Sequence, residues 1–391
     1  MSEFSLFTKK SKILVTCPKG IPPYLAAEIR SLGFPVLKEL TAAVETEGTL
    51  NDSMVMNLML RTGHRVLFLV HSFNAHTADD LYNKLTGIGW EDYISEDAYF
   101  RVTAAVENPN IRDSRFAVLK TKDAVVDRIR VKRGRRPNSG SEQRGAAVFL
   151  YWRGISCNVF LDTSGDPLSR RGYRKIPVKA PMQESLAAST ILATGWNGSG
   201  HFINPMCGSG TLAIEAALIA LDKAPGLLRS AFAFQHLRGF DREAWQSLRR
   251  SARQNTRKEL DWRIIAGDHD AETVRSARQN ARTAGVDHLL EFHVCDFRKT
   301  PIPEGYGIVM INPEYGKRLG ELKSLTGVYK NIGDFFKQSC QGFRGYIFTG
   351  NLDLAKQVGL RTKRRLPFFN GEIECRLLEY ETYSGSRKNS S

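Results

Sequence analysis

The chain has 391 residues, of which 42% are hydrophobic and 25% charged, with a net charge of +15 and a pI near 9.6. This length exceeds one ordinary hydrophobic core, so two or three domains are expected, and the composition excludes large-scale disorder. The sequence has no bilayer-length apolar run, no apolar signal segment near residues 1–12 and no C-x-x-C pair among its six cysteines. These absences argue against a membrane span, a secretory signal, a disulfide framework and a zinc ribbon, and they favour a cytoplasmic protein.

The first 165 residues mix short strand patterns with helix patterns. Apolar runs predict strands at 13–17, 36–44, 58–70 and 99–105, helical spacing predicts helices at 24–32, 76–85 and 115–129, and the runs 146–150 and 157–161 predict a hairpin. No cluster of catalytic side chains occurs in this half. It is therefore expected to be a binding module.

From residue 179 onward, predicted helices and strands alternate. The predicted helices are 179–192, with Pro181 tolerated in its first turn, 211–221 and 271–284, and the predicted strands are 201–204, 263–266, 290–294, 307–311 and 346–349. The insert 222–261 is long for a crossover and carries a basic helix at 244–260, whereas Asn370-Gly371 predicts a hairpin turn. The alternation implies a mostly parallel sheet with helices on both faces, which binds ligands beyond the carboxyl ends of its strands.

A glycine-rich turn follows the strand predicted at 201–204. Gly208 and Gly210 let the backbone approach a ligand, and the next helix offers free N–H groups. Because a dinucleotide site or a plain tight turn satisfies the same pattern, the motif alone leaves the cofactor open. Asp268 and Asp296 follow the next two strands, where they could accept hydrogen bonds from a ribose diol and an adenine amino group. This series of residues favours an adenosine cofactor.

The sequence Asn312-Pro313-Glu314-Tyr315 follows the strand predicted at 307–311. The exocyclic amino group of a base is a poor nucleophile because its lone pair delocalises into the ring. Hydrogen bonds to the Asn312 side-chain oxygen and the Pro313 carbonyl would keep that lone pair available, and Tyr315 can stack on the base. An ordinary Asn-Pro turn is the alternative. The position of the motif after a buried strand favours methyl transfer from S-adenosylmethionine to an unstacked nucleobase.

The excess of basic residues is concentrated at 132–136, 170–175 and 361–365. Clustered Lys and Arg gain from releasing counterions along a phosphate backbone, so a nucleic-acid partner is favoured over a merely soluble basic protein. The residues expected to contact nucleic-acid phosphates are Lys132, Arg133, Arg135, Arg136, Arg170, Arg171, Arg174 and Lys175.

Several segments resemble bacterial THUMP-domain RNA methyltransferases, specifically the guanine-N2 enzymes of large-subunit ribosomal RNA (the amino-terminal half of RlmL, and YpsC-like proteins). These segments are 162–174, which reads Asp-Thr-Ser-Gly…Arg-Gly-Tyr-Arg, then 180–188, 204–211, 312–319 and 369–376. They occur in the family's order over nearly the whole chain, and the segment 162–174 is unusually specific.

The resemblance implies an α/β fold: a Rossmann-like class I methyltransferase domain at 166–391 with a mostly parallel, seven-stranded sheet. A mixed α+β module would precede it, with a ferredoxin-like segment at 1–50 and a THUMP RNA-binding domain at 51–165. It also implies methylation of the guanine N2 of RNA, with Asn312, Pro313, Glu314 and Tyr315 receiving the base and no metal. The residues expected to hold S-adenosylmethionine are Pro181, Asn204, Pro205, Cys207, Gly208, Gly210, Thr211, Asp268, His269, Asp296 and Phe297.

Two residues depart from the family's pattern. Asn204 stands where the family usually has Asp, and Glu314 stands where it usually has Pro; the Pro313 carbonyl remains, so activity is expected to persist. A transfer RNA guanine methyltransferase, an amino-adenine DNA methyltransferase and a non-catalytic RNA-binding or ribosome-assembly protein stay open as alternatives. The sequence also leaves open whether the protein is a monomer or a dimer.

Overall fold

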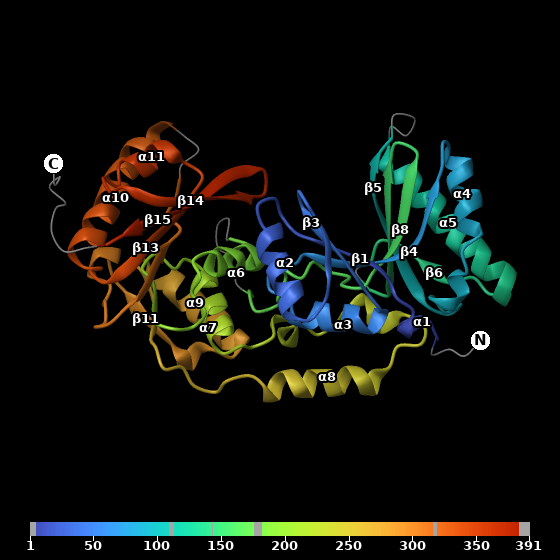
Figure 1. Cartoon of the computed structure of the whole chain (residues 1–391), viewed down its shortest axis with the longest axis horizontal. Coiled ribbons are helices and arrows are strands. Elements are labelled where there is room, and N and C mark those ends of the chain that lie inside the picture. Colours follow the sequence, from blue (N-terminus) through green and yellow to red (C-terminus); the bar gives the residue numbers. More distant parts are fainter. Residues whose placement is uncertain (1–4, 109–112, 143, 176–181, 316–318, 383–391) are drawn as a thin grey trace. The chain divides into compact units, whose positions relative to one another are not determined.

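The computed structural model describes residues 5–108, 113–142, 144–175, 182–315 and 319–382 (Figure 1). The chain divides into two compact units that are not continuous in sequence. The first unit comprises Met1–Cys17, Leu25–Arg170 and Pro225–Ala252, and the second comprises Pro18–Tyr24, Arg171–Ala224 and Arg253–Ser391. Most of the long insert noted in the sequence therefore belongs to the first unit, although it follows the glycine turn in sequence.

The first unit is built on an eight-stranded sheet in the order β2-β3-β1-β4-β8-β7-β5-β6. Neighbouring strands run antiparallel except β5, which is parallel to both β7 and β6. The strands are β1 (Ser11–Thr16), β2 (Val36–Leu40), β3 (Ala43–Gly48), β4 (Arg65–Asn74), β5 (Tyr99–Glu107), β6 (Asn138–Ser139), β7 (Ala146–Arg153) and β8 (Ser156–Asp162).

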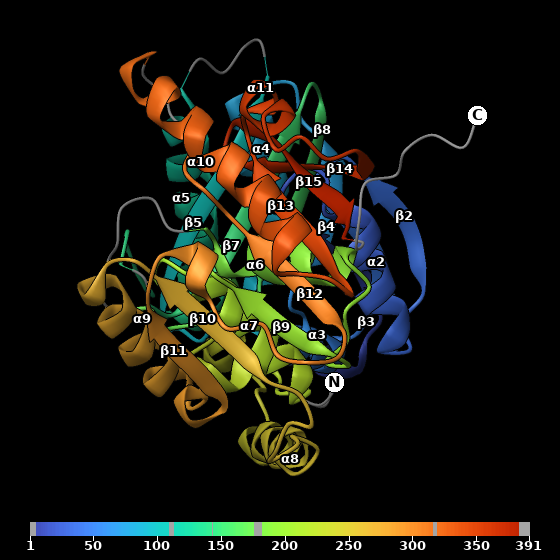
Figure 2. The same cartoon turned by 90° about the vertical axis from the view of Figure 1, so that its left-hand side faces the viewer.

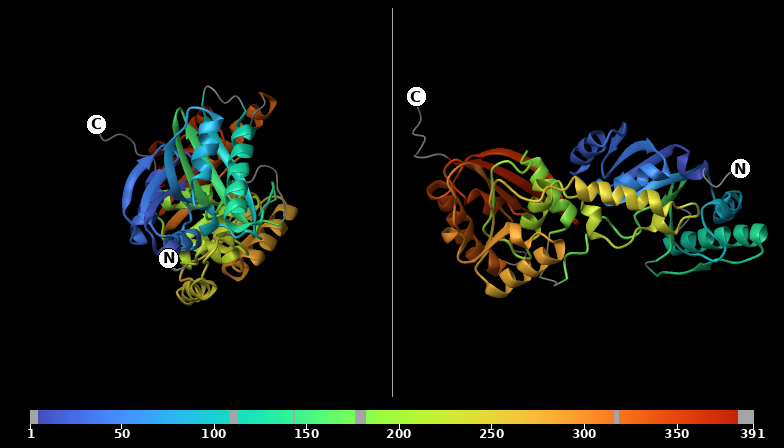
Figure 3. Two further views of the ribbon diagram at one scale, coloured as in Figure 1. Left: turned by 90° about the vertical axis from the view of Figure 1, so that its right-hand side faces the viewer. Right: turned by 90° about the horizontal axis from the view of Figure 1, so that it is seen from below.

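The helices of the first unit pack beside this sheet. They are α1 (Ser5–Thr8), most of α2 (Pro22–Ser31), α3 (Leu50–Met59), α4 (Ala78–Thr86), α5 (Ser114–Arg133) and most of α8 (Arg242–Gln254), with short 3-10 turns η1 (Trp90–Asp92), η2 (Pro225–Leu228) and η3 (Ala233–His236). Helices α4 and α5 lie side by side (Figure 3), and the Tyr82 hydroxyl of α4 donates to Asp127 of α5 at 2.8 Å.

Two sequence predictions in this unit are wrong in detail. The strand expected at 36–44 is a pair, β2 and β3. The strand expected at 58–70 starts too early, because Leu50–Met59 forms helix α3. A capping box starts that helix: Thr49 accepts from the Asp52 N–H at 3.1 Å, and Asp52 accepts from the Thr49 N–H at 2.7 Å. The capping box satisfies N–H groups that would otherwise lack partners.

The second unit is built on a seven-stranded sheet in the order β11-β10-β9-β12-β13-β15-β14. The first five strands in this order run parallel, and β15 runs antiparallel to both β13 and β14. The strands are β9 (His201–Asn204), β10 (Ile264–Asp268), β11 (Leu290–Val294), β12 (Gly307–Ile311), β13 (Phe343–Thr349), β14 (Thr362–Asn370) and β15 (Ile373–Glu381). This sheet confirms the expected mostly parallel, Rossmann-like architecture.

Helices cover both faces of this sheet. They are α6 (Glu184–Ala193), α7 (Thr211–Ala220), α9 (Ala271–Ala284), α10 (Leu319–Gln338) and α11 (Leu352–Lys356), with 3-10 turns η4 (Asp287–Leu289) and η5 (Phe297–Lys299). Ile203 of β9 shares a buried cluster with Tyr329 and Phe336 of α10, which crosses the sheet face in Figure 2. Phe202 packs instead on Trp196, 5.2 Å between ring centroids. Because successive strand residues point to opposite faces, both faces are covered.

Helix α6 begins at Glu184, later than predicted, and Pro181 lies outside the described residues. Among the helices that the structure describes, none has the length and apolar character that a membrane span requires.

Candidate active site

The two sequence motifs meet at one edge of the second sheet. Strands β9 and β12 are parallel neighbours, with Val309 in register with Ile203. Asn204 is the last residue of β9, and Asn312 follows β12 directly. The Asn204 side-chain N–H donates to the Met310 carbonyl at 2.8 Å and so joins the two strand ends. The glycine turn and the Asn-Pro motif therefore leave the sheet side by side, at the edge where parallel sheets bind ligands.

The glycine turn is held by backbone hydrogen bonds. The Cys207 N–H donates to the Gly267 carbonyl at 2.8 Å, and the Gly208 N–H donates to Asp268 Oδ2 at 3.0 Å. Gly210 has a φ of +81° and lies tightly against α9, since a Cβ there would be 3.0 Å from the Ala277 Cβ. A side chain at Gly210 would therefore disturb both the backbone and the packing.

Gly208 has a different role from Gly210. Its φ is +53°, and a Cβ added there would meet no atom within 4 Å. The turn thus leaves free space above Gly208, next to the start of α7, where helix N–H groups attract negative or polar ligand groups. A ligand can approach the backbone closely only where no side chain intervenes, and Gly208 provides such a place beside the start of a helix.

Asn204 leaves an acceptor free at the same place. Its Oδ1 atom is buried and has no hydrogen-bond partner among the described residues. An unpaired buried acceptor is costly unless a ligand donor satisfies it, and the ammonium group of a bound amino-acid moiety is such a donor. The hydrogen bond to the Met310 carbonyl also gives a reason for asparagine where the family usually has aspartate, because an amide can donate this bond and a carboxylate cannot. The orphaned Asn204 oxygen and the open space at Gly208 both fit S-adenosylmethionine.

Asp268 and His269 lie beside the turn at the end of β10. Asp268 is 13% exposed; besides the Gly208 N–H, it accepts from the Asp270 N–H at 3.2 Å and lies 3.2 Å from His269 Nδ1. His269 is 84% exposed. Asp268 therefore shapes the turn, and its role toward a ribose stays a prediction.

Asp296 follows β11 and is already paired. The Arg298 guanidinium donates to both of its oxygens, at 2.9 and 2.7 Å, and the Arg298 backbone N–H adds a third bond at 2.9 Å. This pairing lowers the pKa of Asp296 to about 2. The neighbouring Phe297 packs edge-on against Phe335 at 5.9 Å. A bond from Asp296 to an adenine amino group would have to share this carboxylate with Arg298, so that role also stays a prediction.

The Asn312 side chain presents a second orphaned acceptor. Asn312 is half-buried, and its Oδ1 atom is buried without a hydrogen-bond partner in the part of the chain that the structure describes. Pro313 is buried and Glu314 is exposed. The acceptor expected to take an amino N–H is therefore available and lies directly after β12.

Tyr315 is held from two sides. Its hydroxyl accepts from the Asn370 side-chain N–H at 3.0 Å, and its carbonyl accepts from the Asn351 side-chain N–H at 3.4 Å. A Cβ on Gly350 would lie 3.3 Å from the Tyr315 ring, so that glycine lets the ring approach the backbone. Burial raises the pKa of the Tyr315 hydroxyl. These contacts fix the ring plane, which a stacking residue needs.

Asn280 of α9 is a site residue that sequence reasoning missed. It is fully buried; its N–H donates to the Ser209 carbonyl at 3.1 Å, and its Oδ1 accepts from the Lys175 N–H at 3.2 Å. Asn280 therefore ties the glycine turn to the segment that precedes α6. The only signal in the sequence was an asparagine on the helix after β10.

Of the arginines expected to contact nucleic-acid phosphates, Arg171 is buried and Arg174 is half-buried. Arg171 is 1% exposed and lies 3.5 Å from Glu215 of α7, which is 0% exposed. This burial contradicts the prediction for Arg171. Arg174 is 18% exposed and lies 3.3 Å from Glu184, and it donates to the Thr211 hydroxyl at 3.3 Å. Arg174 therefore braces the start of α7 instead of presenting its charge freely.

The remaining predicted phosphate contacts lie on the surface. Arg170 and Lys175 are exposed, and so are the four basic residues at the end of α5 and just beyond it, namely Lys132, Arg133, Arg135 and Arg136. Lys132 and Arg133 also complement the helix dipole in the last turn of α5, which is a structural reason for their charge. Their contact with nucleic acid stays a prediction.

Comparison with known proteins identifies the class to which this fold and site belong. Three family models match the sequence: the RlmL ferredoxin-like domain at residues 12–67, the THUMP domain at 75–149 and the RMKL-like methyltransferase domain at 171–379. The chain thus contains a ferredoxin-like domain and a THUMP domain, followed by a methyltransferase domain. It belongs to the RMKL-like methyltransferase family, as the sequence resemblance predicted, and its cofactor is S-adenosylmethionine.

Individual relatives agree with this assignment. The chain is 38% identical over 95% of its length to the ribosomal RNA large subunit methyltransferase K/L of Syntrophotalea carbinolica and covers 53% of that protein, so it spans about half the length of such curated relatives. It is 33% identical to a Synechocystis protein provisionally named RNA methyltransferase slr0064, covering 98% of this chain and 99% of that protein. The crystal structure of SMU.472, provisionally named a methyltransferase and complexed with S-adenosylhomocysteine, has a TM-score of 0.87 and 26% identity over 97% of this chain and 100% of that one.

The free space above Gly208 yields a prediction. Gly208→Val is expected to lower S-adenosylmethionine affinity at least tenfold, because its side chain fills that space, and calorimetric titration measures the change. Gly195→Val is the matched control. Gly195 also has a positive φ (+75°), and a Cβ added there would meet no atom within 4 Å. It precedes β9, whereas Gly208 follows β9 on the side where the ligand is expected to bind. Both variants carry a backbone strain of roughly 1–2 kcal/mol. Equal cofactor affinities in the two variants would contradict the assignment of the cofactor space.

Proposed function

We propose that the protein transfers a methyl group from S-adenosylmethionine to the exocyclic N2 amino group of a guanine in RNA, and that this RNA is large-subunit ribosomal RNA. The observation that carries the proposal is the pair of orphaned acceptors, Asn204 Oδ1 and Asn312 Oδ1, at the ends of neighbouring strands. One acceptor suits the ammonium group of the cofactor and the other suits the amino group of the base. Together they would bring donor and acceptor of the methyl group to one edge of the sheet.

The residues of the chain would act by binding and orientation. Asn312 Oδ1 and the Pro313 carbonyl accept the two N–H groups of the base, which favours a pyramidal nitrogen whose lone pair is available. Tyr315, fixed by Asn370, holds the plane of the base. When bound, S-adenosylmethionine supplies an electrophilic methyl group on a sulfonium. The amino nitrogen gains the methyl group as the sulfur–carbon bond breaks, and the nitrogen then loses one proton to solvent.

Glu314 supports guanine as the target base. Guanine carries an N1–H donor next to its N2 amino group, whereas adenine and cytosine carry a ring-nitrogen acceptor next to their amino groups. A carboxylate only accepts hydrogen bonds, so an ionised Glu314 that follows Asn312 and Pro313 matches guanine and repels the other two bases. Glu314 is exposed and therefore free to meet a base that has left its stack. The departure from the family's usual proline thus agrees with the proposed substrate.

An RNA substrate is supported by the first unit and by charge. The THUMP match covers residues 75–149, and the exposed cations that follow α5 lie within that range. The net charge of +15 favours a polyanion. The names of the relatives favour ribosomal RNA over transfer RNA.

A methylation assay tests the proposal. Purified protein, labelled S-adenosylmethionine and unmodified 23S ribosomal RNA are expected to yield N2-methylguanosine after nuclease digestion and mass spectrometry. Unmodified transfer RNA and 16S ribosomal RNA serve as control RNAs and are expected to stay unlabelled. N2-methylguanosine in transfer RNA alone would show that transfer RNA, not ribosomal RNA, is the substrate. N6-methyladenosine would overturn guanine as the target base. Cofactor binding without any methylated RNA would favour a non-catalytic protein.

A further inference from the structure

The long insert ahead of β10 carries a run of positive charge without any acid. Residues 244–258 contain five Lys or Arg residues and no Asp or Glu. The run comprises most of α8 and the four residues after it, and the proposed active site uses none of it. Three of its cations, Arg253, Arg257 and Lys258, belong to the second compact unit, and we call them the insert surface.

The cations of the insert surface lack acidic partners. Each is exposed, and no described residue forms an ion pair with any of the three side chains. Cations elsewhere on the second unit are often neutralised within their own helix, as in the pairs Arg275–Glu272 (3.2 Å), Lys337–Asp334 (3.7 Å) and Lys356–Asp353 (2.7 Å). Unneutralised charge at close spacing attracts an anionic partner much more strongly than paired charge does.

The backbone holds the insert surface in a defined shape. Arg253 lies in the last turn of α8, and the Thr256 N–H donates back to the Arg253 carbonyl at 3.3 Å. The Arg257 N–H donates to the Leu221 carbonyl at 2.8 Å, which anchors the segment to the end of α7. Since α7 begins at the glycine turn, the insert surface is fixed to the helix that follows this turn.

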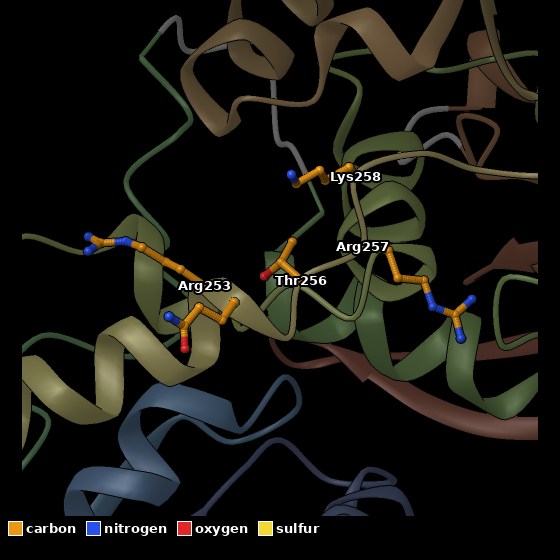
Figure 4. A pocket seen from close by; sticks show the side chains of 5 residues that line it. Arg253, Thr256, Arg257 and Lys258 are labelled. Carbon is orange, nitrogen blue, oxygen red and sulfur yellow. The ribbon is translucent and has the colours of Figure 1, made fainter.

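The side chains diverge around an open hollow. Arg253, Gln254, Thr256, Arg257 and Lys258 line a space of about 470 Å³. Figure 4 shows Arg253 and Arg257 pointing in opposite directions, with Thr256 and Lys258 between them. Groups that grip one phosphate converge on it, whereas groups that follow a polyanion are spread along it. This geometry fits successive phosphates of a chain better than a single small anion.

We propose that the insert surface binds the sugar-phosphate backbone of RNA, away from the nucleotide that is methylated. This proposal takes its RNA partner from the proposed function. A merely structural role as a complement to the helix dipole applies to Arg253 alone, because Arg257 and Lys258 lie beyond the end of α8. An anionic membrane surface fits less well: binding there uses exposed apolar side chains, and Trp245 and Ala252 of α8 are buried.

The salt dependence of RNA affinity tests the proposal. A triple variant, Arg253→Gln/Arg257→Gln/Lys258→Gln, is compared with a control of equal charge change, Arg275→Gln/Lys337→Gln/Lys356→Gln. For single-stranded RNA, three lost phosphate contacts are expected to reduce the slope of log affinity against log salt by about 2. The control is expected to keep a slope close to that of the wild type. Calorimetry with S-adenosylmethionine is expected to give the same affinity for wild type and both variants, which shows that the second unit remains folded.

The outcomes separate this proposal from the proposed function. A wild-type slope in the Arg253/Arg257/Lys258 variant, or an equal loss of slope in both triple variants, would overturn the proposal that the insert surface binds RNA, even if methylation proceeds normally. Conversely, a reduced slope with no methylated product would support the surface and refute the catalytic assignment. Loss of binding to vesicles of phosphatidylserine and phosphatidylcholine, with RNA binding intact, would reassign the surface to a membrane and overturn the proposal.

Discussion

Asn312→Ala is expected to lower the rate of methyl transfer to RNA by two to three orders of magnitude, which is the usual cost of removing one hydrogen-bonding group that acts on the reacting atoms. The alanine cannot accept an amino N–H, so the nitrogen lone pair stays delocalised and the base loses its alignment. Single-turnover incorporation of labelled methyl groups measures this rate. Calorimetric affinity for S-adenosylmethionine is expected to stay unchanged, because the orphaned acceptor assigned to the cofactor belongs to Asn204.

Two further variants sharpen this test. Asn312→Asp keeps an acceptor oxygen of similar size and is expected to retain more activity than the alanine variant. Asn197→Ala removes an exposed asparagine ahead of β9 and is expected to behave as wild type. Normal methyl incorporation by Asn312→Ala, or equal activity in the alanine and aspartate variants, would rule out hydrogen-bond acceptance by Asn312 as its contribution.

The alternating half of the fold was predictable because its elements have clear local patterns. The ranges predicted for β11, β12 and α9 agree with the structure residue by residue. Helix α10 was not predicted, and its internal glycines explain why. Gly333 contacts the neighbouring backbone so closely that a Cβ would lie 1.8 Å from the Val358 carbonyl oxygen. A glycine that normally weakens a helix is required here by a tertiary contact, which local sequence does not reveal.

Only the parts of the candidate site that consist of short, contiguous sequence motifs were predictable. The glycine turn and the Asn-Pro motif are short segments placed by adjacent strands, and parallel-sheet topology brings them together. The supporting asparagines act across the chain: Asn280 reaches Ser209 over 71 residues, and Asn370 reaches Tyr315 over 55. Such pairs have no sequence spacing to recognise.

The cluster at 170–175 shows a second limit of sequence reasoning. A run of arginines indicates charge, but it does not indicate which side chains are buried. Glu215, the partner of Arg171, lies 44 residues away inside an otherwise apolar helix. The sequence signal for this burial was the single glutamate in an apolar helix, because a buried acid requires a partner such as an arginine.

Glu215→Ala is expected to lower the free energy of unfolding of the second unit by about 3–5 kcal/mol, since it removes the buried acid beside the buried Arg171 guanidinium. Glu215 Oε1 lies 3.5 Å from the Arg171 guanidinium and accepts from the Tyr173 hydroxyl at 3.1 Å, so the variant removes two buried contacts at once. Urea denaturation followed by circular dichroism measures the change. The same measurement on Arg171→Met/Glu215→Leu, which replaces the pair by apolar side chains, is expected to show a smaller loss, because it removes both charges of the pair together.

The exposed pair Arg263–Glu291 provides the matched control for this prediction. Its side chains are 47% and 39% exposed, so water solvates either charge when its partner is removed. Glu291→Ala is therefore expected to cost less than about 1 kcal/mol. Because Glu215 lies in α7, directly after the glycine turn, Glu215→Ala should also weaken S-adenosylmethionine binding, whereas Glu291→Ala should not. Similar stability losses in the two alanine variants would mean that water or the other neighbours of Arg171 stabilise its charge when Glu215 is removed, and that the buried pair does not hold α7 in place.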